Sequence, residues 1–198
     1  MTVPSEATRQ RRGAAVVDAV LHATVALVAE RGYGFSVDDV ARRAHVHKTS
    51  IYRRYATRAA LVSAAVEGLT SREISIALTS DPLADLSTLA VSVAALLASP
   101  AGARTLRAVV ASASEDEEAV TTARRFLAGR FDLVVDIVAR AVTLGQLRAG
   151  TDPVSLWGAI VNPLHVRVLL GYPVTEGAAR DLVDLALEGA RVKSAPPL

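Results

Sequence analysis

Between residues 48 and 54 the chain carries a dense row of side chains that can donate hydrogen bonds. The row contains one lysine, two hydroxyl side chains, one phenol and two arginines: Lys48, Thr49, Ser50, Tyr52, Arg53 and Arg54. Cationic and hydroxyl donors of these kinds contact phosphate oxygens and the edges of bases. The first chemistry that the sequence suggests is therefore a surface for a polyanion.

Two short helices joined by a turn are predicted to position this row. Val37, Val40, Ala41 and Ala44 share one helical face, and after a break Ile51 and Tyr55 form a second apolar stripe. Ser36, followed three residues later by Asp39, predicts a capping box at the first helix start. Helices this short bury little surface, so the donors on the second helix, about residues 47–55, are left available to a partner. This is the arrangement of a helix-turn-helix.

The stretch from Phe35 to Leu61 resembles the DNA-binding domain of the TetR family of bacterial transcriptional regulators. The residues that carry the resemblance are, in order, Ser36, Val40-Ala41, Ala44-His45-Val46-His47, Thr49-Ser50-Ile51-Tyr52, Tyr55 and Arg58. His45 stands where the family usually has a turn glycine, which predicts a non-glycine residue at a turn that favours positive φ. His47 stands where the family usually has a serine cap, so a hydroxyl–phosphate contact is missing there.

The resemblance implies that the second helix is a recognition helix that enters the major groove of DNA. We expect Lys48 and Thr49 to contact base edges, and Tyr52 to contact a phosphate or a thymine methyl group. Two further candidates on this helix are Ser50 and Arg53. Three candidates for phosphate contacts lie at helix N-termini, where backbone amides favour an anion: Ser36, His47 and Arg58. The alternative for each residue is a solvated surface side chain.

The charge distribution agrees with a polyanionic partner for the N-terminal part. Residues 1–60 contain ten Lys or Arg and five Asp or Glu, a net charge of +5, and the remaining residues contain 12 and 15, a net charge of −3. A basic end joined to a mildly acidic remainder is expected when that end meets nucleic acid. Arg11 and Arg12, in an arm ahead of the first predicted helix, could add phosphate contacts.

Enzymatic and metal-binding functions find little support. There is no cysteine, which excludes disulfides, thiolate catalysis and Cys-based zinc sites. The four histidines are scattered, and the densest acidic cluster, Glu115–Glu118, is explained by acids in a first helical turn. No phosphate-binding glycine loop or nucleophile elbow occurs. We therefore expect no catalytic residues, no metal and no cofactor.

The predicted fold is all-α, with about nine helices. Residues 1–60 are expected to form the helix-turn-helix domain and residues 61–198 a ligand-binding and dimerisation domain. A first helix is predicted over 14–30, a longer one from Arg58 toward Leu78, and a long one from a Ser114 cap to about Leu144. Further helix starts are marked by a cap followed by proline or by a hydroxyl cap: Asp81-Pro82, Ser99-Pro100, Asp152-Pro153 and Thr175. No signal sequence and no apolar run of about 20 residues is evident, which predicts a cytoplasmic protein without a membrane span.

A single recognition helix contacts only a few base pairs, so the resemblance implies a homodimer on a near-palindrome of double-stranded DNA. The last two predicted helices offer apolar faces for the dimer contact: Trp157, Ile160, Val161, Leu164, Val168 and Leu169 on one, and Leu182, Leu185, Ala186 and Gly189 on the other. The alternative is that both faces pack within one protomer.

The resemblance also implies a small-molecule effector pocket in this part of the chain. The candidate pocket residues are Phe126, Trp157, Asn162 and His165, with Pro163 expected to kink the helix beside them. Because most other wall candidates are Leu, Val and Ala, we expect an apolar ligand. The alternative for this region is a simple bend of the helix in which the polar residues form hydrogen bonds within the protein and contact no ligand.

The sequence thus predicts a sequence-specific DNA-binding transcriptional regulator, and more finely a repressor released by a small apolar ligand. The alternative is an architectural or partner-binding protein that associates with DNA without a small-molecule ligand.

Overall fold

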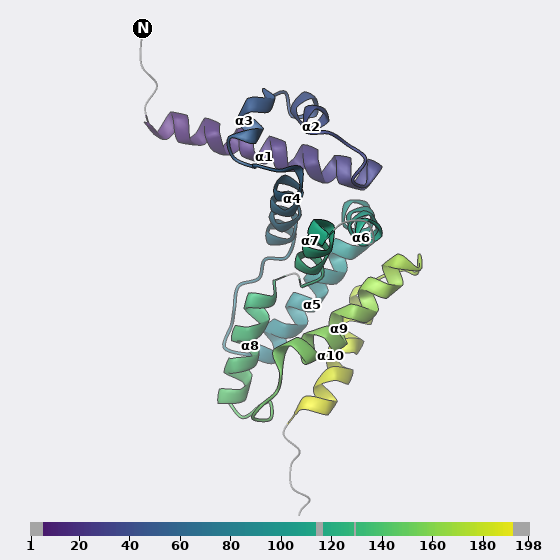
Figure 1. Cartoon of the computed structure of the whole chain (residues 1–198). Coiled ribbons are helices and arrows are strands. Elements are labelled where there is room, and N and C mark those ends of the chain that lie inside the picture. The colour runs from purple at the N-terminus through teal and green to yellow at the C-terminus, as the bar shows by residue number, and fades with distance from the viewer. Residues whose placement is uncertain (1–5, 114–116, 129, 192–198) are drawn as a thin grey trace, which may run out of the picture. The chain divides into compact units, whose positions relative to one another are not determined.

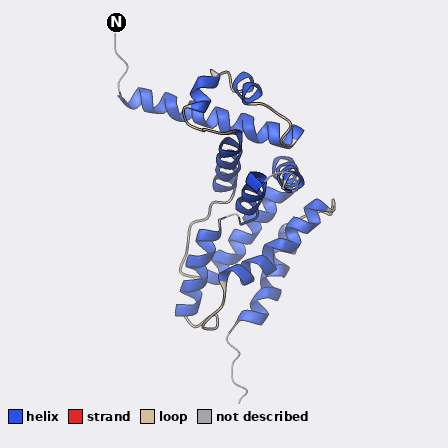
Figure 2. Cartoon of the chain, in the orientation of Figure 1, coloured by secondary structure: helices blue, strands red, loops and turns tan. Residues whose placement is uncertain are grey.

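A computed structural model describes residues 6–113, 117–128 and 130–191, with side chains from residue 13 onward except that of residue 118. Ten helices and no strand occur within these ranges, which confirms the all-α class (Figures 1 and 2). The helices are α1 (Glu6–Arg31), α2 (Val37–Arg43), α3 (Lys48–Tyr52), α4 (Arg58–Glu73), α5 (Pro82–Ala98), α6 (Pro100–Ser112), α7 (Glu117–Ala128), α8 (Phe131–Thr143), α9 (Pro153–Leu169) and α10 (Glu176–Ala190).

The internal contacts divide the chain into two compact units. Unit 1 comprises Met1–Leu69 and Arg107–Phe126, and unit 2 comprises Thr70–Leu106 and Leu127–Leu198. Unit 1 therefore contains the predicted helix-turn-helix, whereas unit 2 contains α5 and α8 to α10. The domain boundary after residue 60 stays a prediction.

The core of unit 1 is built around α1. Its apolar residues recur at helical spacing, so that Val20, Leu27 and Val28 are buried together on one side. Val40 from α2 and Ile51 from α3 are also fully buried. These contacts fix two helices that are too short to be stable alone.

The first helix is longer than predicted. It begins at Glu6 instead of about residue 14, so residues 11 and 12 belong to α1 and not to an arm ahead of it. Their side chains lie outside the described ones.

The sequence analysis found no segment that is long and apolar enough to span a membrane, but one helix of the structure meets both conditions. Gly13–Arg31 is apolar and long enough, and the sharply bent pair α5–α6 passes the same test if it is taken as one span. Such a helix near the N-terminus is weak support for a span, because core helices of soluble proteins share the property. Apolar side chains of α1, such as Val20 and Leu27, are indeed buried inside the protein.

Four helix starts in unit 2 follow their predicted caps. Ser99 accepts a hydrogen bond from the Gly102 amide at the start of α6. Asp81 and Asp152 accept hydrogen bonds from the first backbone amides of α5 and α9, each with a proline in the first turn. Thr175 accepts one from the amide of Ala178 at the start of α10. The side-chain acceptors satisfy amides that have no partner within the helix.

Two predicted helices end earlier than the sequence pattern indicated. α4 ends at Glu73, five residues before Leu78, and the chain continues in non-helical form with Ile74 buried. The predicted helix from Ser114 to Leu144 is two helices, because α7 ends at Ala128 and α8 begins at Phe131. Glycine at position 129 disfavours a continuous helix. The predicted cap Ser114 lies outside the described residues.

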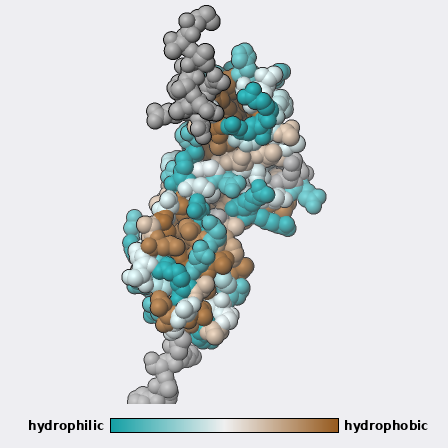
Figure 3. Space-filling model, turned by 90° about the vertical axis from the view of Figure 1, so that its left-hand side faces the viewer, coloured by the Kyte–Doolittle hydropathy of each residue, from teal (hydrophilic) through white to brown (hydrophobic). Residues whose placement is uncertain are grey.

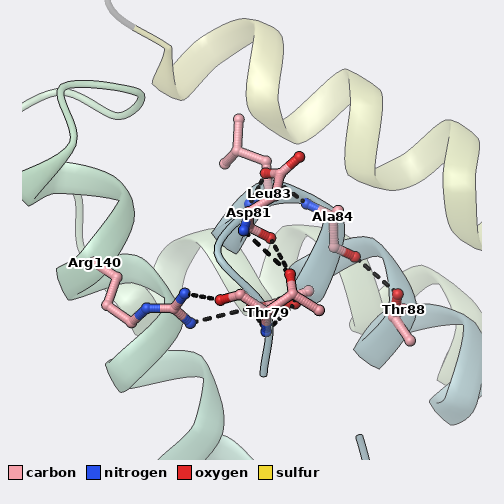
Figure 4. Close-up of polar contacts among 7 residues, drawn as sticks. Thr79, Asp81, Leu83, Ala84, Thr88 and Arg140 are labelled. Atoms are coloured by element: carbon pink, nitrogen blue, oxygen red, sulfur yellow. Dashed lines mark hydrogen bonds and ion pairs between the residues drawn. The ribbon is translucent and has the colours of Figure 1, made fainter. Parts of the chain in front are cut away.

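A polar cluster centred on the buried Asp85 fastens the connection between α4 and α5 inside unit 2. Figure 4 labels two of its members, Thr79 and Arg140. The Asp85 carboxylate of α5 accepts hydrogen bonds from the Thr79 backbone amide at 3.0 Å and from the Thr79 hydroxyl at 2.7 Å. Arg140 of α8 donates to Asp85 at 3.1 Å and also to the Thr79 carbonyl oxygen. We call these three residues the Asp85 cluster. Burial is the largest single influence on Asp85 and opposes its ionisation, but the bonds from Thr79 and Arg140 together hold its pKa below the usual value.

The surface of unit 2 is not uniformly polar. Figure 3 shows brown, apolar residues gathered in patches on the face turned to the viewer, with teal, polar residues between them. The large apolar side chains that are exposed in unit 2 include Val135, Leu144, Val166, Leu170 and Leu185.

Candidate functional site

The turn between α2 and α3 has the geometry that the sequence predicted. His45 has a φ of 54°, in the left-handed region that usually favours glycine. The Val46 amide donates to the Ala41 carbonyl oxygen at 3.0 Å and closes the turn after α2. The chain can thus reverse and start α3 at Lys48 within a few residues.

The capping box at the start of α2 is confirmed. The Ser36 amide donates to Asp39 Oδ2 at 2.8 Å, and the Asp39 amide donates to Ser36 Oγ at 3.2 Å. The Ser36 hydroxyl also donates to Asp39 Oδ2 at 2.8 Å. The Ser36 backbone bond, its hydroxyl bond and nearby Arg42 and Arg31 lower the pKa of Asp39. Ser36 is therefore fully engaged in capping, which argues against the predicted phosphate contact from its hydroxyl.

Arg43 holds α2 against α1, a contact that the sequence analysis missed. Its Nη1 and Nη2 atoms donate to the two carboxylate oxygens of Glu30, each at 2.6 Å. A bidentate pair of this kind is geometrically specific as well as attractive. The two residues are 13 apart in the sequence, so helical spacing gives no sign of their contact.

α3 buries one side chain and exposes its donors. Ile51 is 2% exposed and anchors the helix, whereas Lys48 and Thr49 are exposed and Tyr52 is 51% exposed. Ser50 is half-buried. Lys48 Nζ lies 3.3 Å from Asp38 Oδ1 of α2, in an ion pair in which both side chains face solvent. The donor row predicted from the sequence is thus presented outward by a short, anchored helix.

The other candidates for phosphate contacts differ in their surroundings. His47 is exposed and is the N-cap of α3, without a side-chain capping bond. Arg58 is exposed, but its Nη1 donates to the carbonyl oxygens of Tyr33 at 2.7 Å and Phe35 at 3.0 Å. Its guanidinium carbon also lies 5.8 and 5.9 Å from the centres of these two rings. These contacts give Arg58 a structural role through Nη1, and its phosphate contact stays a prediction.

A groove of about 580 Å³ runs between α1 and the end of α3. Apolar side chains of α1 form one wall, and Arg53 and Arg54 line the other side. The residues that line it are Gly13, Val16, Val17, Val20, Ser50, Ile51, Arg53, Arg54 and Tyr55. Both arginines are exposed, so this groove extends the basic surface beyond the five residues of α3.

A second pocket, of about 300 Å³ and open to the surface, lies in unit 2. It is lined by Leu127, Ala128, Phe131, Val154, Trp157, Gly158, Val161 and Asn162. None of these side chains is charged, and Asn162 is the polar member of the set. Two of the four predicted pocket residues, Trp157 and Asn162, are thus brought together, whereas Phe126 and His165 are not among its lining residues.

His165 is instead a buried residue of α9. It is 6% exposed, and within the described part of the chain its Nδ1 atom has no hydrogen-bond partner. Burial lowers the pKa of His165 to about 4, so the imidazole is neutral at physiological pH.

The predicted dimer face of α9 is wrong in most of its residues. Trp157, Ile160, Val161, Leu164 and Val168 are all at most 3% exposed and belong to the core of the protomer. The apolar residues that α9 exposes near its C-terminal end are Val166, Leu169 and Leu170. On α10, Leu185 is exposed as predicted, and Leu182 and Ala186 are half-buried.

Comparisons with known proteins agree with this arrangement. Residues 20–65 match the model described as bacterial regulatory proteins, tetR family, and residues 76–186 match the Tetracyclin repressor-like, C-terminal domain. The chain is 31% identical to the HTH-type transcriptional regulator AqdR of Rhodococcus erythropolis, over 91% of this chain and 87% of that protein.

Solved structures give the same result. The TetR family transcription regulator SCO0332 is 26% identical with a TM-score of 0.71, over 88% of this chain and 97% of that one. A TetR transcriptional regulator from Agrobacterium tumefaciens is 24% identical with a TM-score of 0.70. The match covers 88% of this chain and 94% of that one, and it supports the fold.

Within the described residues no group of three or more His, Asp or Glu side chains could hold a metal ion. The matched proteins are regulators and not enzymes. The helix-turn-helix in unit 1, together with two family matches that span most of the sequence, shows that this chain belongs to the TetR family and is a DNA-binding transcriptional regulator.

Proposed function

We propose that this regulator is a repressor that binds a near-palindromic operator as a homodimer and is released by a small, uncharged, apolar ligand. The observation that carries the proposal is the outward row of donors on α3, anchored from behind by Ile51. A repressor of this kind would act in the cytoplasm, where the DNA is.

The DNA contacts are proposed from exposure and chemistry. Lys48 and Thr49, at the start of α3, are the candidates for base edges, and exposed Tyr52 is the candidate for a phosphate or a thymine methyl group. Ser50, Arg53 and His47 are further candidates, because they lie on or beside the same surface. Ser36 is left out, since its hydroxyl is engaged with Asp39. Arg58 stays a candidate for a phosphate contact, because its side chain is exposed and its bonds to Tyr33 and Phe35 use Nη1.

Homodimerisation is proposed through α9 and α10. Both helices expose large apolar side chains that a soluble monomer would leave in water: Val166, Leu169, Leu170 and Leu185. A symmetric pair of these helices would form a four-helix contact. Sedimentation of the Leu185→Glu variant tests this surface: we expect monomers at concentrations where the unaltered protein is a dimer, and an unchanged dimer would move the interface elsewhere.

The ligand class is proposed from the pocket in unit 2. Its uncharged lining offers an ion no partner of opposite charge, which disfavours charged ligands. Its volume of about 300 Å³ is at the small end of the range for ligand sites. We therefore propose a small neutral ligand in contact with Phe131, Trp157 and Asn162.

Two measurements separate this function from an architectural role. Selection from a random pool of duplexes should enrich a near-palindrome with half-sites about one helical turn apart. A screen of small neutral compounds by thermal shift should then find ligands that raise the melting temperature and also release the selected duplex. Weak sequence preference, or ligands that bind without releasing DNA, would favour the architectural alternative.

A further inference from the structure

Two neighbouring acids in the first turn of α2 have different surroundings. Asp39 bonds to Ser36 through its amide and carboxylate, and it also pairs with Arg42 at 3.1 Å. Asp38 takes no part in the capping box. Its carboxylate instead faces Lys48 across the turn, at 3.3 Å, with about 60% of each side chain exposed.

We propose that Asp38 is a specificity-determining residue that positions Lys48 and, together with it, recognises a G·C base pair. The inference rests on the proposed role of Lys48 in contacting base edges. It assigns to α2 a part in sequence recognition that the donors of α3 cannot supply alone.

The chemistry follows from what the pair presents to a groove. A lysine ammonium is a flexible point charge that binds any phosphate or base acceptor. Beside it, the Asp38 carboxylate is an acceptor with free oxygen lone pairs directed to solvent. In the major groove guanine offers two acceptors, N7 and O6, and its partner cytosine offers the N4 amino donor. A lysine and a carboxylate side by side therefore complement a G·C pair.

The carboxylate also disfavours the wrong contact. If Lys48 bound a phosphate instead of a base, Asp38 would be brought near the same negative charge. The Asp38 carboxylate thus favours binding to a base edge and disfavours binding to the DNA backbone. This gives the difference of affinities that specificity requires.

The exposure of the pair suits exchange with DNA. Ion pairs between solvent-exposed side chains contribute little to stability, so little is lost when DNA rearranges this one. Removing the Asp38 charge should therefore leave the fold intact, which allows recognition to be tested without unfolding the protein.

The test uses the full-length protein with the duplex selected from a random pool, and with calf-thymus DNA as the nonspecific competitor. Asp38→Asn removes the charge at nearly constant size, Asp38→Glu keeps it, and Asp39→Asn is the matched control on the neighbouring residue. For each protein one measures the dissociation constants for both DNAs, their salt dependence, the base preferences of a repeated selection, and the melting temperature.

We expect Asp38→Asn to reduce the ratio of selected to nonspecific affinity by about 5- to 100-fold, the range for losing one specific base contact. The preference at one G·C pair should relax, nonspecific binding should tighten, and the melting temperature should stay the same. Asp38→Glu should recover part of the ratio. Asp39→Asn should lower the melting temperature and keep the ratio, when measured where the variant is folded.

Two outcomes would overturn the inference. An unchanged ratio in Asp38→Asn would remove Asp38 from recognition, and a reduced ratio without relaxation at any G·C pair would remove the base contact. The Lys48→Ala variant separates a failure of this inference from a failure of the proposed function. If Lys48→Ala loses discrimination between the two DNAs while Asp38→Asn keeps it, Lys48 recognises bases and only the role of Asp38 is wrong.

Discussion

The two units each contain a carboxylate–cation pair of similar length but opposite environment. In unit 1, Lys48 and Asp38 lie 3.3 Å apart with 59% and 60% of their side chains exposed. In unit 2, Arg140 and Asp85 lie 3.1 Å apart with 35% and 3% exposed. The first pair joins α2 to α3 at the surface, and the second joins α5 to α8 around the Thr79 connection (Figure 4).

We infer from the difference that burial, and not the distance between the charges, decides what a pair does. The buried Asp85 cannot lose its partner without leaving a charge in a poorly hydrated place, so the Asp85 cluster fixes the fold. The exposed Asp38 and Lys48 exchange freely with water, so their groups remain available to DNA. Substitutions at the two pairs should therefore change the free energy of unfolding to very different extents.

Removing Arg140 should have the largest effect. Arg140→Ala leaves the buried Asp85 with only its bonds to Thr79. We expect the free energy of unfolding to fall by about 3–4 kcal/mol, near the lower end of the range for breaking a buried pair. The melting temperature should fall by roughly 10 °C. Urea unfolding at fixed protein concentration measures the loss.

Arg180→Ala is the matched control, because Arg180 pairs with Glu176 at 3.7 Å on the exposed surface of α10. It should change the free energy of unfolding by less than about 1 kcal/mol. If both variants lose the same stability, burial does not distinguish the pairs and the comparison fails.

His165 should make unit 2 sensitive to acid. Because burial lowers its folded pKa to about 4 from an ordinary value of 6.5, the unfolded chain binds a proton more readily between these values. The stability that depends on a neutral His165 is therefore fully present above about pH 6.5. It is lost as the pH falls toward 4, by about 3 kcal/mol in all.

The His165→Leu variant removes this titration and should flatten the profile of unfolding free energy between pH 6.5 and 4. Asp85, whose folded pKa is lowered, contributes only below about pH 4, where its stabilisation is lost as the pH falls. A profile that keeps its slope in His165→Leu would assign the acid sensitivity to another group.

Ser36→Ala should have an intermediate effect in unit 1. It removes the side-chain half of the capping box, for which we expect a loss of about 1 kcal/mol. Because the hydroxyl is occupied by Asp39, affinity for the selected duplex should stay within about twofold once the protein is folded. A large loss of affinity without a loss of stability would restore Ser36 as a phosphate contact.

The local features of this protein could be predicted from the sequence because their causes are local. The Ser36–Asp39 capping box, the Asp81 and Asp152 caps and the positive φ of His45 each depend on residues within a few positions of one another. The donor face of α3 was predictable for the same reason, since its spacing fixes which side chains share a surface.

Contacts between distant residues could not be predicted in this way. Asp85 and Arg140 are 55 residues apart, and Arg58 reaches carbonyl oxygens 23 and 25 residues away. α9 illustrates the same limit: it is apolar on both sides, so its periodicity cannot tell the core face of Leu164 and Val168 from the exposed side of Val166 and Leu170. Which face is buried depends on α5, α8 and α10, and thus on the whole fold.

Lys48→Ala provides the most direct test, with the smallest expected effect on stability. We predict a change below about 0.5 kcal/mol in the free energy of unfolding, as for an ordinary surface substitution, together with a clear loss of discrimination between the selected duplex and a scrambled one. The opposite result, unfolding at lower urea with discrimination intact, would show that the exposed pair serves the fold and that α3 does not recognise DNA through Lys48.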